Sequence, residues 1–365
     1  MVSFYGLALG NAADYQRELL SCTVFDHLAL AVQAAGGRLF LCGEESGGAV
    51  SSSEDFWARV GDGCALLLLA PAAALSADAL TRLAKQPEPA CLVAGRQPLA
   101  VFGQAAALRG CDLSRLPGEL AQVQAGPAEG LVVSDAESAY AVQEQLRRRI
   151  NLDWMKKGVT LVDPNTTFID PRAVLAPGCT LLPGCMIHGE STVAAGAVIG
   201  PNTWLKSAHI GERVTVNASQ VVESSVGADT TVGPFAYIRP GCVIGEKTRI
   251  GDFVELKNSR IGDGTKVSHL TYIGDSDFGK GINVGCGVVT VNYDGKKKYR
   301  TTVEDHAFIG CNVNLVSPVK VGRGAYLAAG GTITEEVPED ALVVARARAV
   351  VKPLWAKKRR EDGKL

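Results

Sequence analysis

The chain has 365 residues, 47% of them hydrophobic, and a formal net charge of −1. This length allows two domains, and the near-zero charge indicates no nucleic-acid partner, because the basic cluster AKKRRED near the C-terminus is typical of a solvated tail. Ten cysteines with no CxxC pair and no His/Cys cluster at ligand spacing exclude a zinc site and a disulfide framework. We find no signal-peptide pattern, and the apolar run from Ala65 to Leu75 is too short to cross a membrane, so we expect a cytoplasmic protein without a membrane partner.

Residues 1–135 carry the pattern of a small α/β domain. Short apolar runs at 39–43 (LFLCG), 65–69 (ALLLL) and 90–95 (ACLVAG) alternate with helical stretches, which predicts strands alternating with helices. The segments EESGGAVSSS (44–53) and AGPAEG (125–130) are typical of loops.

A connecting helix is expected at 136–158. The sequence AESAYAVQEQLRRRINLDWMKK predicts it, with Ser134 or Asp135 as the N-cap and Gly158 after its end. We expect the arginine triplet 147–149 to face solvent or the neighbouring domain rather than a ligand.

Residues 159–345 are organised by a six-residue repeat. Aliphatic-Gly pairs recur mostly at intervals of six or twelve residues, with their glycines at 227, 233, 245, 251, 262, 274, 285, 310 and 322. This period fits neither an amphipathic helix nor a hairpin, and it predicts a parallel β-helix of hexapeptides with roughly ten turns. We expect each aliphatic residue to point into the coil, each Gly to relax the backbone at a corner, and Cys179 and Cys185 to be small buried fillers.

The stretch 254–300 is the most informative part of the repeat. It holds the lone His269 and then the lysine-rich excursion TVNYDGKKKYRT, which interrupts the period between Gly285 and Gly310. The excursion includes the turn sequence Asn-Tyr-Asp-Gly, so an ordinary hairpin loop with solvated lysines is the alternative to a functional loop. Residues 346–365 leave the repeat and form a C-terminal segment with a basic tail.

Several motifs closely resemble one family. LRRRI, GVTLVDPNTTFID, VGPFAYIRPG, IGDFVELKNS, VSHLTYIGD, NVGCG, NYDG and YLAAG resemble the acetyltransferase half of the bifunctional bacterial UDP-N-acetylglucosamine pyrophosphorylase/glucosamine-1-phosphate N-acetyltransferase. The resemblance runs from about residue 133 to 348. It implies a left-handed parallel β-helix after the α/β domain, a homotrimer, and acetyl-CoA bound in clefts between neighbouring coils.

The resemblance also implies a site for an amino-sugar phosphate. Acyl transfer from a thioester to an amine needs a base for the amine, stabilisation of the oxyanion and alignment of both reactants. The resemblance assigns the base to His269, since a neutral imidazole suits that task; a histidine that only satisfies the coil is the alternative. It assigns the sugar phosphate to Arg239, Lys257, Tyr272, Asn283 and Lys298. For Asn283 the alternative is an internal ladder in which its amide binds the coil backbone.

Six positions are expected to contact acetyl-CoA by the same resemblance: Cys286, Asn292, Tyr293, Cys311, Ala329 and Arg346. The family usually has Ala where Cys286 stands and Ser where Cys311 stands. Backbone contacts survive both changes, whereas a hydroxyl bond at residue 311 weakens to a thiol bond. A nucleophilic cysteine that carries an acyl-enzyme intermediate is the alternative to direct attack.

The family's other half is a nucleotidyltransferase, and residues 1–135 resemble a shortened, degenerate form of it. The segment LALGNAAD (7–14) resembles the phosphate-binding loop LxxGxGTR, with alanine for the second glycine and aspartate for the arginine, which adds bulk and a repelling charge. Pro71 and Ser134 stand where the family has two metal-binding residues. We therefore expect no Mg²⁺ site in this domain and no other metal site.

The sequence thus predicts an acetyl-CoA-dependent glucosamine-1-phosphate N-acetyltransferase that serves UDP-N-acetylglucosamine and peptidoglycan synthesis, with uridylyl transfer lost. Two alternatives stay open: a non-catalytic trimeric scaffold or regulator, prompted by the degenerate first domain, and an acyltransferase with a different amino-sugar acceptor. The joint presence of His269, Arg239, Lys257 and Tyr272 favours an enzyme over a scaffold.

Overall fold

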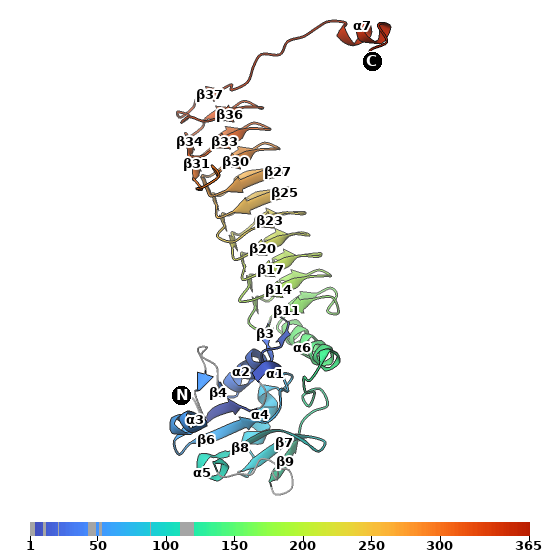
Figure 1. Ribbon diagram of the computed structural model, residues 1–365, viewed down its shortest axis with the longest axis vertical. Coiled ribbons are helices and arrows are strands. Elements are labelled where there is room, and N and C mark those ends of the chain that lie inside the picture. Colours follow the sequence, from blue (N-terminus) through green and yellow to red (C-terminus); the bar gives the residue numbers. More distant parts are fainter. Residues whose placement is uncertain are drawn as a thin grey trace. The chain divides into compact units, whose positions relative to one another are not determined.

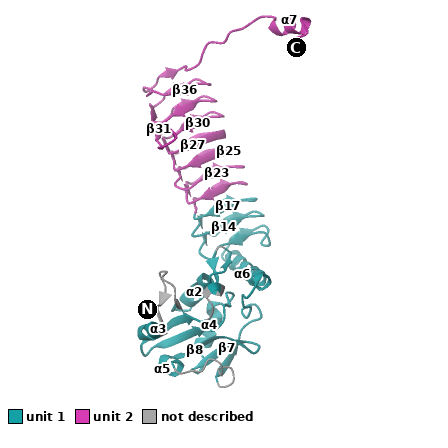
Figure 2. Cartoon of the chain, in the orientation of Figure 1, with its two compact units in different colours: residues 1–207 teal, residues 208–365 magenta. Residues whose placement is uncertain are grey.

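The computed structural model describes residues 4–9, 12–20, 22–42, 49–50, 53–87, 89–109 and 120–365. Residue contacts divide it into two compact units, residues 1–207 and 208–365 (Figure 2). The first unit holds an α/β domain, a long helix and eight coil strands, and the second unit holds further coil strands and a C-terminal helix, all counted within those described ranges.

A mixed sheet forms the centre of the α/β domain. Within the described residues its strand order is β5-β4-β1-β6-β8-β7-β9, with β1 parallel to β4 and β6, and with β8 antiparallel to β6 and β7. The strands are β1 (Phe4–Ala8), β4 (Gly37–Cys42), β5 (Ala49–Val50), β6 (Cys64–Leu68), β7 (Ala90–Ala94), β8 (Gln97–Gln104) and β9 (Ala121–Gln124); β2 (Glu18–Leu19) and β3 (Cys22–Thr23) pair separately. The three apolar runs that predict strands are β4, β6 and β7, so that prediction is confirmed.

Helices cover both faces of this sheet. On β6, Leu66 and Leu68 point into one core and Leu67 points into the other, as the alternation of side chains along a strand requires. Because both faces are buried, the strand is apolar at successive positions. The helices are α1 (Ala12–Tyr15), α2 (Val24–Ala34), α3 (Ser53–Val60), α4 (Ala77–Ala84) and α5 (Ala105–Leu108).

Two expectations in this region fall partly outside the described residues. Gly10 and Asn11 of the degenerate phosphate loop are not described, nor are residues 43–48 and 51–52 around the first predicted loop. The second predicted loop, 125–130, contains neither helix nor strand, as expected.

The predicted connecting helix is α6 (Ala136–Lys156), and Asp135 is its N-cap. Of the arginine triplet, Arg148 is exposed, while Arg147 is buried and donates to the Pro164 carbonyl and the Glu144 carboxylate. Arg149 donates to the Ala74 carbonyl (2.7 Å). Arg148 therefore faces solvent, whereas Arg147 contacts the start of the coil and Arg149 contacts the α/β domain.

The repeat folds as a parallel β-helix, as its period predicts (Figure 1). In each unit the strands of one turn pair in parallel with the equivalent strands of the next. The coil strands of the first unit are β10 (Thr160–Leu161), β11 (Phe168–Ile169), β12 (Val174–Leu175), β13 (Thr180–Leu181), β14 (Met186–His188), β15 (Thr192–Val193), β16 (Val198–Ile199) and β17 (Trp204–Lys206).

The coil of the second unit contains two strands that are much longer than the rest, β25 (Arg249–Lys257) and β27 (Lys266–Gly274). The others are β18 (His209–Ile210), β19 (Thr215–Val216), β20 (Gln220–Val222), β21 (Ser225–Val226), β22 (Thr231–Val232), β23 (Tyr237–Ile238), β24 (Val243–Ile244), β26 (Arg260–Ile261), β28 (Ser276–Phe278), β29 (Asn283–Val284), β30 (Val289–Val291), β31 (Thr301–Val303), β32 (Phe308–Ile309), β33 (Asn314–Val316), β34 (Val319–Val321), β35 (Tyr326–Leu327), β36 (Thr332–Ile333) and β37 (Leu342–Val343).

The glycines of the aliphatic-Gly pairs have a different role from the one predicted. Of the nine, Gly233 alone has a positive φ. At the others a side chain has no room: a Cβ on Gly262 would lie 2.5 Å from the carbonyl carbon of Gly279 on the next turn. The left-handed corner positions are occupied instead by residues such as Gly264 and Asn258. The prediction that the paired glycines relax corners is therefore wrong, because close stacking of turns is what requires them.

The coil interior is apolar, as expected. Cys179 and Cys185 are fully buried, and burial raises the pKa of each thiol to about 11, so both behave as small apolar fillers. After β37 the chain ends in α7 (Trp355–Glu361), which has no buried residue and carries the basic tail. In the described part of the chain, no helix is both long and apolar enough to cross a membrane.

Candidate active site

Asp252 and His269 face each other on the two long strands. β25 and β27 lie side by side in the coil (Figure 1), and their register pairs Asp252 with His269. His269 Nδ1 lies 2.5 Å from Asp252 Oδ1. The next residue on each strand, Phe253 and Leu270, has a left-handed backbone and an exposed side chain, so the pair lies at a corner of the coil. The hydrogen bond from His269 is the main reason why the pKa of Asp252 is lowered.

A cluster of cations lies just after this corner. Arg239 Nη1 is 2.8 Å from Glu255 Oε1, and Lys257 Nζ is 3.1 Å from Asp275 Oδ2. Lys298 lies against Lys257; the hydrogen bond and the charge of Lys257 lower the pKa of Lys298, and the charge of Arg239 lowers it further. Among the described residues, no carboxylate lies within ion-pair distance of Lys298. The cluster therefore has spare positive charge for an anion.

Asp275 holds this cluster together from below the surface. Its carboxylate accepts hydrogen bonds from Lys257, from Asn258 Nδ2 (2.7 Å) and from Asn292 Nδ2 (2.6 Å). Burial raises the pKa of Asp275, but these three hydrogen bonds and the charge of Lys257 outweigh it, so the pKa is lowered overall. One buried carboxylate thus links residues from three successive turns.

The lysine-rich excursion is a hairpin loop that returns to the cluster. Tyr293 and Lys298 form an antiparallel bridge, and the Asp294 carboxylate accepts the backbone N–H groups of residues 296 and 297. Tyr293 is exposed, and its hydroxyl donates to the Gly295 carbonyl. The turn expected as the alternative is thus present, but Asn292 is buried beneath it and the exposed Lys298 lies against Lys257. The loop belongs to the cluster.

Asn283 is exposed on β29, opposite Lys266 of β27. An internal asparagine ladder is therefore wrong, because the side chain points away from the coil interior. Tyr272 lies on β27 opposite Glu255, and its hydroxyl is 3.5 Å from Asn292 Nδ2. The structure brings Arg239, Lys257, Tyr272 and Lys298 together, while Asn283 lies on the other side of the corner, near the strand segment that leads to His269.

Four of the residues expected to bind acetyl-CoA form a column along one edge of the coil. Asn312 N donates to the Cys286 carbonyl and Gly330 N donates to the Cys311 carbonyl, both at 2.8 Å, which stacks these turns directly. Arg346 Nε donates to the Ala329 carbonyl (2.9 Å) at the end of the column. Cys311 is exposed and Cys286 is half-buried, so the column has an accessible surface. Asn292 and Tyr293 belong to the excursion instead.

Three carboxylates in this region were not predicted: Asp252, Glu255 and Asp275. Each accepts a hydrogen bond from a predicted site residue. The spacing could have revealed one of them, because Asp252 precedes His269 by 17 residues, which is also the register shift between β25 and β27. Recognising that shift requires knowing that this turn is one residue shorter than three hexapeptides.

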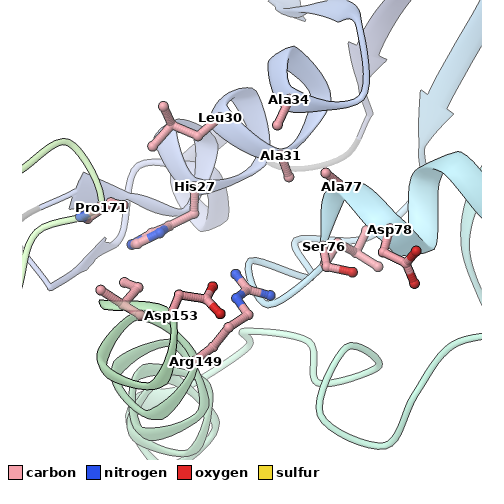
Figure 3. A pocket seen from close by; sticks show the side chains of 12 residues that line it. His27, Leu30, Ala31, Ala34, Ser76, Ala77, Asp78, Arg149, Asp153 and Pro171 are labelled. Carbon is pink, nitrogen blue, oxygen red and sulfur yellow. The ribbon is translucent and has the colours of Figure 1, made fainter. Parts of the chain in front are cut away.

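None of the predicted site residues lies in the first unit, which contains a cavity of about 320 Å³ between α2, α4 and α6 (Figure 3). Two of its polar side chains engage the protein's own backbone: His27 Nε2 lies 2.8 Å from the Leu19 carbonyl oxygen, and Arg149 donates to the Ala74 carbonyl. Pro71 and Ser134 also make structural contacts, since the Pro71 carbonyl accepts Val133 N–H and Ser134 N–H donates to Ser138.

Comparisons with known proteins agree with a coil of hexapeptide repeats. The family model for the bacterial transferase hexapeptide (six repeats) matches residues 223–258. The bifunctional protein GlmU of Brevibacillus brevis is 48% identical over 238 residues, which are 65% of this chain and 52% of that protein. The GlmU of Acetivibrio thermocellus is 50% identical over 232 residues, 64% of this chain and 50% of that protein. About two thirds of this chain is therefore similar in sequence to about half of GlmU.

The homology has a defined extent. The chain spans about half the length of the GlmU proteins it matches. Among solved structures, the UDP-N-acetylglucosamine acyltransferase of Francisella novicida is 17% identical, covers 56% of this chain and 74% of its own, and superposes with a TM-score of 0.32. The relationship to GlmU therefore rests on sequence identity together with the hexapeptide coil.

Proposed function

We propose that the chain transfers an acetyl group from acetyl-CoA to the amine of glucosamine 1-phosphate, as the acetyltransferase half of GlmU would. The observation that carries this proposal is the neighbourhood of two groups on consecutive turns. A histidine with a free Nε2 lies on β27, and Arg239, Lys257 and Lys298 gather just beyond it. A base beside a phosphate site is what an amino-sugar phosphate requires.

The proposed chemistry uses these groups in sequence. Nε2 of His269 takes a proton from the neutral amine of the sugar as the amine nitrogen attacks the thioester carbonyl. The C–N bond forms, the C–S bond breaks, and the imidazolium returns the proton to the departing thiolate, which leaves as the free thiol of coenzyme A. Lys257, Lys298 and Arg239 hold the phosphate, with Arg supplying a bidentate donor and each Lys a point charge. Tyr272 and Asn283 are proposed to contact the sugar.

Acetyl-CoA is proposed to lie along the column formed by Cys286, Cys311, Ala329 and Arg346, with Asn292 and Tyr293 at its side. Stacked turns place backbone groups of this column at regular spacing, and a backbone contact is insensitive to the cysteines at 286 and 311. We also propose a homotrimer. Its support is the exposed apolar edge formed by Phe235, Phe253 and Leu270 beside the candidate base, because large exposed apolar side chains in a row mark a contact surface.

Residues 1–135 are proposed to lack uridylyl transfer and to serve folding, trimer geometry or protein contact, with no Mg²⁺ bound there. The support is the sequence of the degenerate phosphate loop and the structural roles of Pro71 and Ser134. Incubation with UTP, Mg²⁺ and N-acetylglucosamine 1-phosphate should release no pyrophosphate, and robust release would overturn this part of the proposal.

The acceptor is tested by offering several amines. Purified full-length protein is incubated with acetyl-CoA and, in turn, glucosamine 1-phosphate, glucosamine 6-phosphate and glucosamine, and the products are identified by mass spectrometry. We expect acetylation of glucosamine 1-phosphate with kcat/KM at least about tenfold above the others, the factor that about 1.4 kcal/mol of extra transition-state binding gives. Preference for another amine selects a different acyltransferase, and no product with any amine selects the scaffold alternative.

A further inference from the structure

We infer that Asp252 is a positioning residue for His269, holding the imidazole by Nδ1 so that Nε2 faces the acceptor amine as the free base. This inference rests on the proposed function for its catalytic meaning. The orientation of the ring, however, is a property of the chain that can be measured without turnover.

The geometry defines which nitrogen is available. A neutral imidazole has one N–H and one lone pair, and an ionised carboxylate can only accept, so the short contact between Nδ1 and Oδ1 places the proton on Nδ1. The lone pair then lies on Nε2, which has no hydrogen-bond partner among the described residues. The side chain of His269 is 53% exposed, so Nε2 remains accessible from outside the coil.

Register makes the pair structurally rigid. Asp252 and His269 lie in the middle of the two longest strands of the coil, whose pairing runs from Arg249–Lys266 to Lys257–Gly274. Their backbones are therefore fixed on both sides, and the hydrogen bond needs no ordering of a loop. A pair at this exposed corner adds little stability, since solvent screens surface ion pairs. Its consequence is the orientation of the ring.

The charges around the pair are few. Arg249 and Lys266 lie on the same two strands before the corner, Glu255 and Tyr272 follow it, and β29 on the next turn presents the neutral Asn283. The carboxylate is ionised at neutral pH, since hydrogen bonding from His269 lowers its pKa. An ionised Asp252 favours the imidazolium that forms during transfer, as the aspartate of serine-protease triads does for its histidine.

Cys286 lies on the turn after His269. The register pairs Lys266 with Asn283 and Tyr272 with Val289, which places Cys286 opposite His269. No hydrogen bond joins the thiol to the imidazole in the described structure. The hydrogen bond of the His269 side chain is therefore the one to Asp252. This arrangement fits an imidazole that acts as base on a bound amine better than one that acts on the Cys286 thiol.

The test compares Asp252→Asn with a matched control, Asp229→Asn. Asp229 is also an exposed coil carboxylate, paired with Arg213 at 2.7 Å, but lies away from the candidate site. An asparagine at 252 can donate its amide N–H to Nδ1 and thereby stabilise the opposite tautomer. We expect kcat for thiol release to fall about tenfold to a hundredfold, less than the roughly 10² to 10⁴-fold contribution of the base itself, with KM unchanged.

Nitrogen-15 NMR of histidine-labelled protein supplies the readout that does not need turnover, and the chain has only five histidines. We expect His269 to carry its proton on Nδ1 in the native protein and to lose that preference in Asp252→Asn, while Asp229→Asn resembles native protein in every measurement. A native-like tautomer and a native-like kcat in Asp252→Asn would overturn the inference. Loss of the tautomer in a protein that never releases thiol would instead retain the orienting role and reject the proposed function.

Discussion

Lys257 Nζ lies 3.1 Å from Asp275 Oδ2, across one turn of the coil, and the side chain of Asp275 is only 8% exposed. Lys257 belongs to the proposed phosphate site, whereas Asp275 is buried beneath it and also binds Asn258 and Asn292. The proposed phosphate site therefore depends on a carboxylate that lies buried beneath it.

Removal of this carboxylate should destabilise the coil. Asp275→Ala leaves Lys257, Asn258 and Asn292 without their shared acceptor, and breaking a buried pair in this way costs about 3 kcal/mol. Asp277→Ala is the matched control, since Asp277 pairs with Arg300 in an exposed position, where a pair contributes less than about 1 kcal/mol. Urea unfolding followed by circular dichroism measures both changes, and equal losses would contradict the anchoring role of Asp275.

Asp275 should also make the free energy of unfolding depend on pH. Because its hydrogen bonds hold the pKa of Asp275 below the ordinary value despite burial, the ionised carboxylate stabilises the folded state above the unfolded pKa of about 3.9. That contribution is lost as the pH falls through the folded pKa. Native protein should therefore lose unfolding free energy below pH 4 more steeply than Asp275→Asn does, in unfolding curves recorded from about pH 3 to 7. Parallel curves would show that Asp275 contributes nothing to acid lability.

Substitutions at two neighbouring glycines test whether the coil needs glycine for close stacking of turns or for backbone conformation. Gly262→Ala places a Cβ against the backbone of Gly279, which should cost about 1 to 3 kcal/mol through overpacking. Gly264 has φ +68° and open space around it, so Gly264→Asn should be nearly neutral, because Asn tolerates the left-handed region. Thermal melts of the two variants provide the comparison. A larger loss for Gly264→Asn would restore the view that backbone freedom is what these corners need.

Cys286→Ala distinguishes direct attack from a covalent intermediate. The thiol makes no hydrogen bond to His269 in the described structure, and alanine still provides the backbone groups of the column. We expect kcat to change by less than about threefold, which corresponds to well under 1 kcal/mol. A loss of several hundredfold, together with acetyl-labelled Cys286 in a peptide digest of the native protein, would favour the acyl-enzyme route.

The fold was largely predictable from the sequence because two simple patterns indicate it. Short continuous apolar runs made β4, β6 and β7 recognisable, and the six-residue period defined the coil. What the period could not show was why glycine recurs, since the clash that a Cβ on Gly262 would make with Gly279 depends on how closely two turns stack. That spacing is a tertiary property.

The residues of the candidate site could be predicted only where the resemblance to a known family supplied them. His269 and the cation cluster followed from motifs, but Asp252 and Asp275 did not, because their importance lies in contacts across one turn with a shift of 17 or 18 residues. Asn283 shows the complementary limit. Periodicity alone left its side chain either inside or outside the coil, and the position is settled by the pairing of β29 with β27.

We propose His269 as the base for acetyl transfer to an amino-sugar phosphate. This role is tested most directly by the rate of thiol release from acetyl-CoA in the presence of glucosamine 1-phosphate, comparing native protein with His269→Ala. We expect release by the native protein and a loss of roughly 10² to 10⁴-fold in the variant, with acetyl-CoA binding retained. Equal rates in the two proteins would contradict the role of His269, and the absence of release from both would contradict the proposed enzyme.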